Sequence, residues 1–529
     1  MSLVPSRILV ADPIAEDGVG RLRAAGEVDV ATGLSPDQLL GCIADYEALV
    51  VRSETKVTAK VLESARRLRV VGRAGVGVDN IDIEAATRHG VLVLNAPTGN
   101  TIAAAEHAIA LMMALARNVA AADHSVQAGR WERGRFVGVE LRHRTLGVYG
   151  LGKIGFEVAR IASQGLQMRV ITHDPLVTTE RAEQAGAELR TLSEILEESD
   201  VLSLHVPLND VTRGSIGADQ LSRMKRGAHL INVARGGIVD EAALAESIRS
   251  GHLRGAGIDV FAEEPIDPGN PLIGLPGSVL TPHLGASTQE AQVNVALDVA
   301  DQIVEFLAGG SPRSAVNAPT VLPEELAQLR PYVELAVKMG SLAAQLGGSR
   351  LRRVICGYSG ALAEHDTTVL TAEVLRGLFG HFTETRVNMV NAKAVARQHG
   401  VEVDERRTTG SSDHAGSILV EVEGAEPLTV MGTQFGGEPH ITRIKDLHLD
   451  IRPVGTYLVF SQQDRPGVIA EVAGLLAAHD INLGDVIVGR DHPRGRALSF
   501  FQLDDPVDAE LLAQIEKSAN LGSLRLITF

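Results

Sequence analysis

Short apolar runs alternate with longer amphipathic stretches through roughly the first 290 residues of the chain. The runs are rich in Val, Ile and Leu and lie at residues 7–10, 48–51, 69–71, 91–94, 146–150, 169–172, 201–205 and 229–233. Runs of this kind, separated by stretches with helical periodicity, are typical of parallel strands covered by helices on both faces of the sheet. The pattern therefore predicts α/β architecture for this part of the chain.

Two longer helical patterns divide this α/β region. The first runs from Thr101 to about Ala122 and is apolar on almost every side, which predicts one helix buried between two α/β domains. The second, Thr288–Ala308, would return the chain to the first domain. We therefore expect one domain from residues 1–98 together with 289–317, a second from 99–288, and a catalytic cleft between them.

The pattern changes after the Gly-Gly-Ser-Pro at 309–312. A helical stretch at 323–346 and several strand-like runs ending near Ile451 predict an α+β domain over residues 318–452. Residues 453–529 read as strand, helix, two strands, helix and strand. That order predicts a small ferredoxin-like domain at the end of the chain.

Composition and charge narrow the function classes. A chain of 529 residues is too long for a single hydrophobic core, and its formal net charge of −16 argues against binding to nucleic acid or to an anionic membrane surface. An anionic substrate would need a local cluster of arginines. The two cysteines and the 17 histidines show no metal-ligand spacing, and we find no signal peptide and no apolar run long enough to cross a bilayer. We therefore expect a cytoplasmic protein without a metal site.

A glycine motif follows the strand-like run at 146–150. Gly150, Gly152 and Gly155 form Gly-x-Gly-x-x-Gly at the start of a helical stretch, with Lys153 and Ile154 inside the motif. Glycines at this spacing allow a tight turn and a close approach to a pyrophosphate, which the free N–H groups of the helix N-terminus then bind. Nineteen residues beyond Gly155, Asp174 ends the next apolar run, at the distance expected for an acid that binds a ribose hydroxyl. The motif predicts an NAD site, since a carboxylate disfavours the 2′-phosphate of NADP.

Three further segments supply the residue types needed for hydride transfer: NVARGG at 232–237, GIDVFAEEP at 257–265 and TPHLGAST at 281–288. Oxidation of a secondary alcohol requires a base, a cation for the substrate carboxylate and an acid that orients the base. His283, Arg235 and Glu264 are candidates for these roles. Taken singly, each also has an ordinary interpretation as a loop histidine, a surface cation or a solvated acid.

These segments, in this order behind the glycine motif, resemble the D-2-hydroxyacid dehydrogenase family over about residues 1–317. The resemblance implies a doubly wound Rossmann-type NAD domain inserted in a flavodoxin-like substrate domain. It implies that His283 is the general acid/base, that Glu264 hydrogen-bonds the other ring nitrogen, and that Arg235 holds the substrate carboxylate. The residues implied to line the cofactor site are His205, Pro207, Thr212, Val233, Ala234, Asp259, Gly285 and Ala286.

Two segments, VVRSETKV at 50–57 and VGRAGVGVDNID at 71–82, look like those of the phosphoglycerate dehydrogenases within this family. This likeness implies oxidation of 3-phospho-D-glycerate to 3-phosphooxypyruvate with NAD, in the first step of L-serine biosynthesis. The residues implied to bind the substrate are Arg52 and Ser53 at the phosphate, the backbone of Val76 and Gly77 at the carboxylate, and also Arg73 and Asn100. Two alternatives stay open: another 2-hydroxyacid dehydrogenase acting on glycerate, glyoxylate or 2-oxoglutarate, and an NAD-sensing binding protein.

Residues 455–529 resemble an ACT domain, and the whole layout resembles the long form of these dehydrogenases, which has an intervening domain before it. The resemblance implies a homodimer or homotetramer with edge-paired ACT domains, and possible feedback by L-serine held by Asp464 and Asn482. Gln462 stands where some relatives have a tyrosine. In the intervening domain, only Arg452 matches the basic residues implied to bind anions, because His440 and Leu447 replace the others.

Overall fold

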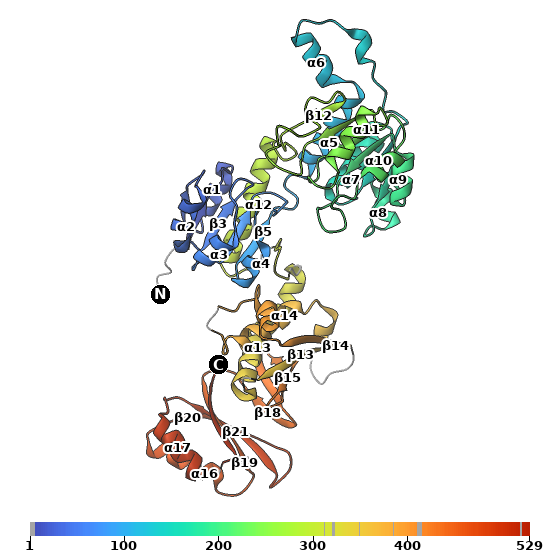
Figure 1. The fold of residues 1–529 in the computed structure, drawn as a ribbon. Coiled ribbons are helices and arrows are strands. Elements are labelled where there is room, and N and C mark those ends of the chain that lie inside the picture. Colours follow the sequence, from blue (N-terminus) through green and yellow to red (C-terminus); the bar gives the residue numbers. More distant parts are fainter. Residues whose placement is uncertain are drawn as a thin grey trace.

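The computed structural model describes residues 6–310, 313–319, 323–348, 350–383, 386–409, 415–518 and 521–529. Four sheets follow one another along the chain, and in Figure 1 they form separate bodies of an elongated molecule, with the first body between the second and the third. Each sheet lies within one of the four residue ranges predicted above, while the domain boundaries themselves stay a prediction. The α/β class, the α+β third part and the ferredoxin-like end are confirmed.

The first sheet has five parallel strands in the order β2-β1-β3-β4-β5, which is the flavodoxin-like arrangement. The strands are β1 (Ser6–Val10), β2 (Gly26–Val30), β3 (Ala48–Val51), β4 (Val70–Arg73) and β5 (Leu92–Asn95). The helices are α1 (Glu16–Leu22), α2 (Pro36–Cys42), α3 (Ala59–Ser64), α4 (Ile83–Arg88) and the returning α12 (Gln289–Leu307). Sequence reasoning missed β2, because this edge strand is only partly buried and its polar residues hide the pattern.

The second sheet has seven parallel strands in the order β12-β11-β10-β9-β6-β7-β8, the doubly wound Rossmann arrangement. The strands are β6 (Thr145–Tyr149), β7 (Arg169–His173), β8 (Ala187–Leu189), β9 (Val201–Leu204), β10 (His229–Asn232), β11 (Gly255–Ile258) and β12 (Ser278–Leu280). The helices around it are α7 (Lys153–Arg160), α8 (Thr179–Gln184), α9 (Leu192–Glu198), α10 (Ala218–Arg223) and α11 (Glu241–Arg249). The winding reverses between β6 and β9, and ligands bind at the carboxyl ends of the strands at such a point.

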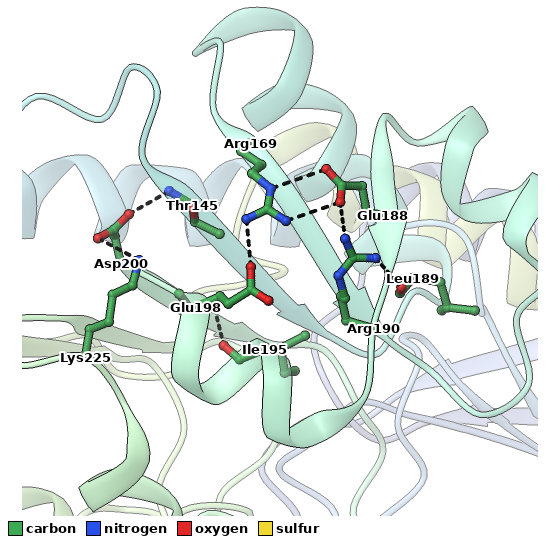
Figure 2. A network of polar contacts seen from close by, with 10 residues as sticks. Thr145, Arg169, Glu188, Leu189, Arg190, Ile195, Glu198, Asp200 and Lys225 are labelled. Carbon is green, nitrogen blue, oxygen red and sulfur yellow. Dashed lines mark hydrogen bonds and ion pairs between the residues drawn. The ribbon is translucent and has the colours of Figure 1, made fainter.

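An ion-pair network lies at the opposite, amino edge of this sheet (Figure 2). Arg169 at the start of β7 contacts Glu198 at 2.7 Å and Glu188 at 3.2 Å. Asp200, just before β9, accepts a hydrogen bond from the Thr145 backbone N–H at 2.8 Å. Because these ion pairs are largely solvated, each contributes little to stability. The network links the amino ends of neighbouring strands and lies away from the cofactor turn.

The predicted continuous helix from Thr101 to about Ala122 is wrong. The chain forms α5 (Thr101–Ala116) and α6 (Val119–Gln127), which meet at 64° because Asn118 adopts a left-handed conformation with φ of 52°. α5 has a buried face that includes Ala105, Ala108 and Leu111, whereas α6 projects from the body in Figure 1. In the part of the chain that the structure describes, no single helix is long and apolar enough to span a membrane, although this bent pair passes that test together.

The third sheet is mixed, with the order β14-β13-β15-β16-β17-β18, and the fourth is antiparallel, with the order β20-β21-β19-β22. The third comprises β13 (Leu351–Gly360), β14 (Glu402–Thr408), β15 (Gly416–Gly424), β16 (Leu428–Phe435), β17 (Glu438–Ile444) and β18 (Leu447–Ile451), with α13 (Pro323–Gly347), α14 (Thr368–Phe379) and α15 (Ala392–Gln398). The fourth comprises β19 (Thr456–Gln463), β20 (Leu483–Arg490), β21 (Arg496–Leu503) and β22 (Ser523–Thr528), with α16 (Val468–Ala478) and α17 (Ala509–Ser518). The predicted order of elements in the last part is confirmed.

A short segment of the third part of the chain, which includes Asn388 and Val390, packs against the first part. Val390 is buried in the same apolar cluster as Ile8 and Ile303, and the Asn388 side chain donates to the Gly90 carbonyl at 2.7 Å. The last strand in turn contacts α13, where Gln345 accepts a hydrogen bond from Thr528 at 3.0 Å.

Candidate active site

The glycine turn at the end of β6 is shaped by close backbone contacts. A Cβ at Gly155 would lie 2.0 Å from the Gly150 carbonyl oxygen, so no side chain fits there, and Gly150 has a left-handed φ of 93°. By contrast, a Cβ at Gly152, the residue that precedes α7, would have no atom within 4 Å. Open space above free helix N–H groups fits the pyrophosphate of NAD.

The residues around this turn are held by local hydrogen bonds. The Asp174 carboxylate accepts from the Leu151 backbone N–H at 2.8 Å, which ties β7 to the turn. The His205 ring contacts the Ser203 hydroxyl at 2.8 Å, and burial lowers the pKa of His205 to about 4, so the ring is neutral. The Thr212 hydroxyl donates to the Pro207 carbonyl at 2.5 Å and closes the neighbouring loop.

His283 and Glu264 form a pair after β12 and β11. Nδ1 of His283 lies 2.7 Å from Oε2 of Glu264, and the other Glu264 oxygen accepts from the Phe261 backbone N–H at 3.0 Å. Burial by itself would raise the pKa of Glu264, but these two hydrogen bonds outweigh it and the pKa is lowered. Glu264 is therefore ionised and can accept a hydrogen bond from Nδ1 of His283. The structure thus brings together two of the three predicted catalytic side chains.

The turn that carries His283 is anchored on Asp259, whose side chain is fully buried. The carboxylate accepts from the backbone N–H groups of Leu284 at 2.7 Å and Gly285 at 2.9 Å and from the Thr281 hydroxyl at 2.5 Å. The backbone carbonyl of Asp259 accepts from the His283 N–H at 2.9 Å. Sequence reasoning assigned Asp259 to the cofactor alone and missed this anchoring role.

Arg235 points toward the first domain rather than toward Glu264. Its Nε lies 3.3 Å from Asp79, and a Cβ at Gly77 would lie 2.2 Å from its Nη2. Burial lowers the pKa of Arg73 to about 10, with nearby Arg235 and then Arg52 also contributing. The Arg73 Nε is buried and has no hydrogen-bond partner among the residues that the structure describes. Three arginines of two domains thus face one region, which is the local cationic cluster that an anionic substrate requires. Asp79 lies in the segment at 71–82 but was not predicted as a site residue.

The other predicted substrate residues lie around this cluster. Among the described residues, the Arg52 guanidinium reaches only the Pro13 carbonyl, at 3.4 Å, and Ser53 is exposed. The Val76 carbonyl accepts from the Asn95 side chain at 2.6 Å, and Asn100 precedes α5 with its Oδ1 buried and without a partner in the described part of the chain. Lys153 lies 3.5 Å from the Pro97 carbonyl. The Ala234 backbone N–H donates to the Asn232 side chain at 3.1 Å and its carbonyl accepts from Arg235 at 2.7 Å. The other predicted cofactor residues, Ile154, Val233 and Ala286, have apolar side chains.

In the last domain, the two predicted effector residues do not meet each other through any hydrogen bond of the described residues. Asp464 accepts from the Arg490 side chain at 3.0 Å and from the Arg494 backbone N–H at 2.9 Å. The Asn482 side chain donates to Asp504 at 2.6 Å. Gln462 donates to Ser499 at 2.8 Å, while its Oε1 is buried with no partner in the described ranges of the chain.

Comparison with family models places three known domains on the chain. The D-isomer specific 2-hydroxyacid dehydrogenase NAD binding domain matches residues 109–285, the D-3-phosphoglycerate dehydrogenase intervening domain matches 328–445, and the ACT domain matches 456–520. The match to the NAD binding domain covers the glycine turn as well as the His283 and Glu264 pair.

Several curated proteins match almost the whole chain. The D-3-phosphoglycerate dehydrogenase of Archaeoglobus fulgidus is 45% identical over 97% of this chain and 98% of its own length, and that of Synechocystis is 42% identical over 98% and 94%. Among solved structures, the NAD-dependent formate dehydrogenase of Staphylococcus aureus in complex with NAD is 27% identical with a TM-score of 0.52, covering 57% of this chain and 96% of that one. The TT0316 protein of Thermus thermophilus is 36% identical with a TM-score of 0.54, over 59% and 99%. The chain therefore belongs to the D-3-phosphoglycerate dehydrogenase family of NAD-dependent oxidoreductases.

Proposed function

We propose that the protein oxidises 3-phospho-D-glycerate to 3-phosphooxypyruvate with NAD, in the first step of L-serine biosynthesis. The observation that carries this proposal is the cluster of Arg52, Arg73 and Arg235 on the same chain as the His283 and Glu264 pair. Substrate and product are polyanions, whereas the protein has a net charge of −16 and repels them at long range. Binding therefore depends on local, charge-assisted contacts.

The electrostatics of the cluster favour an anionic ligand. Burial and the guanidiniums of Arg235 and Arg52 weaken proton binding by Arg73, while the carboxylates of Asp79 and Asp12 act in the opposite direction. An anion placed among the three cations would relieve this repulsion. We assign the substrate carboxylate to Arg235 and the N–H groups of Val76 and Gly77, and the phosphate to Arg52 and Ser53.

In this mechanism, NAD supplies the acceptor for the hydride that leaves the C2 carbon of the substrate. The glycine turn and α7 would hold its pyrophosphate, and Asp174 would bind a ribose hydroxyl. Neutral His283 takes the hydroxyl proton at Nε2, and Nδ1–H donates to Glu264, which stabilises the imidazolium that forms. Arg235 polarises the developing carbonyl. In the reverse direction the imidazolium returns the proton.

The test is substrate discrimination by Arg52. Arg52→Ala should raise KM for 3-phosphoglycerate by roughly tenfold to a hundredfold, since a guanidinium–phosphate contact is a charge-assisted pair, and should leave a phosphate-free 2-hydroxy acid nearly unaffected. Arg23→Ala, on an exposed ion pair with Glu16, removes the same charge elsewhere and serves as the control. Wild-type protein that reduced a phosphate-free keto acid far better than phosphooxypyruvate would overturn the substrate assignment.

Assembly and feedback are further parts of the proposal. Val119, Val126 and Trp131 on and after α6 are 54%, 55% and 80% exposed, and Val486 and Val488 on the edge strand β20 are 42% and 40% exposed. Apolar side chains left in water on a projecting helix and on a sheet edge support pairing with a second copy. We propose a homodimer or homotetramer, to be measured by light scattering. A monomer at micromolar concentration would refute it.

Feedback by L-serine would act through the last domain. A serine at Asp464 and Asn482 must compete with Arg490 and Asp504, which already occupy these side chains. Initial rates with and without L-serine test this directly. The cytoplasmic location stays a prediction.

A further inference from the structure

We propose that His107, a residue outside the predicted catalytic set, is a positioning residue that sets the turn carrying His283 by donating a hydrogen bond to Asp259. This inference rests on the proposed function, because it concerns the same acid/base residue. It adds a side chain from α5, the helix that connects the two α/β domains, to the machinery of the reaction.

Asp259 is the centre of the arrangement. Three successive backbone N–H groups, those of His283, Leu284 and Gly285, all donate to it, the first to its carbonyl and the other two to its carboxylate. His283 itself has a left-handed φ of 55°, which is unfavourable for a residue other than glycine and must be imposed by its surroundings. The orientation of the Asp259 carboxylate therefore decides where the imidazole points.

His107 contacts this carboxylate from α5. Its Nε2 lies 3.1 Å from Oδ1 of Asp259 and 3.1 Å from the Thr281 hydroxyl, and its side chain is 19% exposed. Ionised Asp259 can only accept, and the Thr281 hydroxyl already donates to the same oxygen, so the donor must be the Nε2–H of His107. Burial by itself would raise the pKa of Asp259, but the hydrogen bonds from His107, Thr281 and Leu284 outweigh it, and the pKa is lowered.

The helix behind the turn is also in contact with it. A Cβ at Gly285 would lie 3.0 Å from Val233 Cγ1 and 3.9 Å from the Cβ of Ala104, one turn before His107 on α5. The turn is thus packed between Val233, which follows β10, and α5, with little space for another arrangement. If His107 is lost, a fully buried carboxylate keeps only three donors from the turn itself, and its orientation is less restrained.

The experiment compares His107→Leu with His107→Gln in the full chain. Glutamine places an amide N–H near the position of Nε2 and should keep kcat within about threefold of wild type, whereas leucine should lower kcat roughly tenfold to a hundredfold. KM for 3-phosphoglycerate should change less than about threefold in both variants, because the arginine cluster lies elsewhere. Glu106→Gln, at the exposed neighbouring position on α5, is the matched control.

A second variant tests whether His107 acts through Asp259. Thr281→Val removes the other side-chain donor to Asp259, and its effect on kcat should combine with that of His107→Leu less than multiplicatively, since both act on one carboxylate. A His107→Leu protein with wild-type kcat, or a His107→Gln protein as impaired as the leucine variant, would overturn the inference. An inactive wild type would instead overturn the proposed function, and the same comparison would then be made with whichever keto acid the protein reduces.

Discussion

Replacement of Glu264 by glutamine tests the acid/base pair most directly. The carboxylate uses both oxygens, one toward His283 at 2.7 Å and the other toward the Phe261 N–H at 3.0 Å. Glutamine has a single oxygen for these two donors, so one of them must face an amide NH₂. Glu264→Gln therefore removes both the negative charge and one hydrogen bond while the shape of the side chain is kept.

The size of the effect follows from distance and exposure. Two unit charges about 4 Å apart attract by roughly 1 kcal/mol in water and roughly 4 kcal/mol near a protein surface. Because the His283 and Glu264 side chains are 48% and 38% exposed, solvent screens them, and we take about 1–2 kcal/mol. This corresponds to a loss of roughly fivefold to thirtyfold in kcat/KM for the step that needs imidazolium.

The kinetic constant that changes distinguishes this account from general damage. Glu264 contacts the proposed acid/base residue and Arg235 faces Asp79 instead, so Glu264→Gln should lower kcat in both directions while KM for 3-phosphoglycerate changes less than about threefold. NADH absorbance at saturating cofactor measures both constants, with exposed Glu263→Gln as the control. A KM that rises as much as kcat falls would refute the reasoning.

Three other outcomes follow from the geometry. Gly77→Ala would place a methyl group 2.2 Å from the Arg235 Nη2 and displace that guanidinium, so KM for the substrate should rise about tenfold or more while NAD affinity, measured by fluorescence titration, is kept. Burial raises the pKa of Cys356 to about 12, so its thiol should resist iodoacetamide at about pH 8 until the protein is unfolded, as peptide mass mapping would show. The lowered pKa of Asp259 stabilises the fold above about pH 4, and this stabilisation is lost as the pH falls, so Asp259→Asn should have a shallower decline in unfolding free energy between about pH 5 and 2 in urea titrations.

Sequence reasoning worked where a local pattern defines the backbone. The buried strands could be predicted because Val and Ile fill both faces of a parallel strand, and the glycine turn because a Cβ at Gly155 has no space. It failed at β11, whose residues Gly255–Ile258 are mostly small, and at Asn118, whose left-handed conformation ends α5 inside an apolar stretch. In both places the local sequence is compatible with more than one backbone path, and packing decides between them.

The domain types and the NAD turn could be predicted from sequence, because each depends on residues close together in the chain or on a motif with fixed spacing, and the same motifs predict His283 and Glu264 as the acid/base pair. The contact of Arg235 with Asp79, and that of His107 with Asp259 across 152 residues of sequence, depend on the fold. The physical reason is that a hydrogen bond or an ion pair depends on distance in space. A lone histidine in an apolar helix carries no sign of the carboxylate that the fold will place beside it.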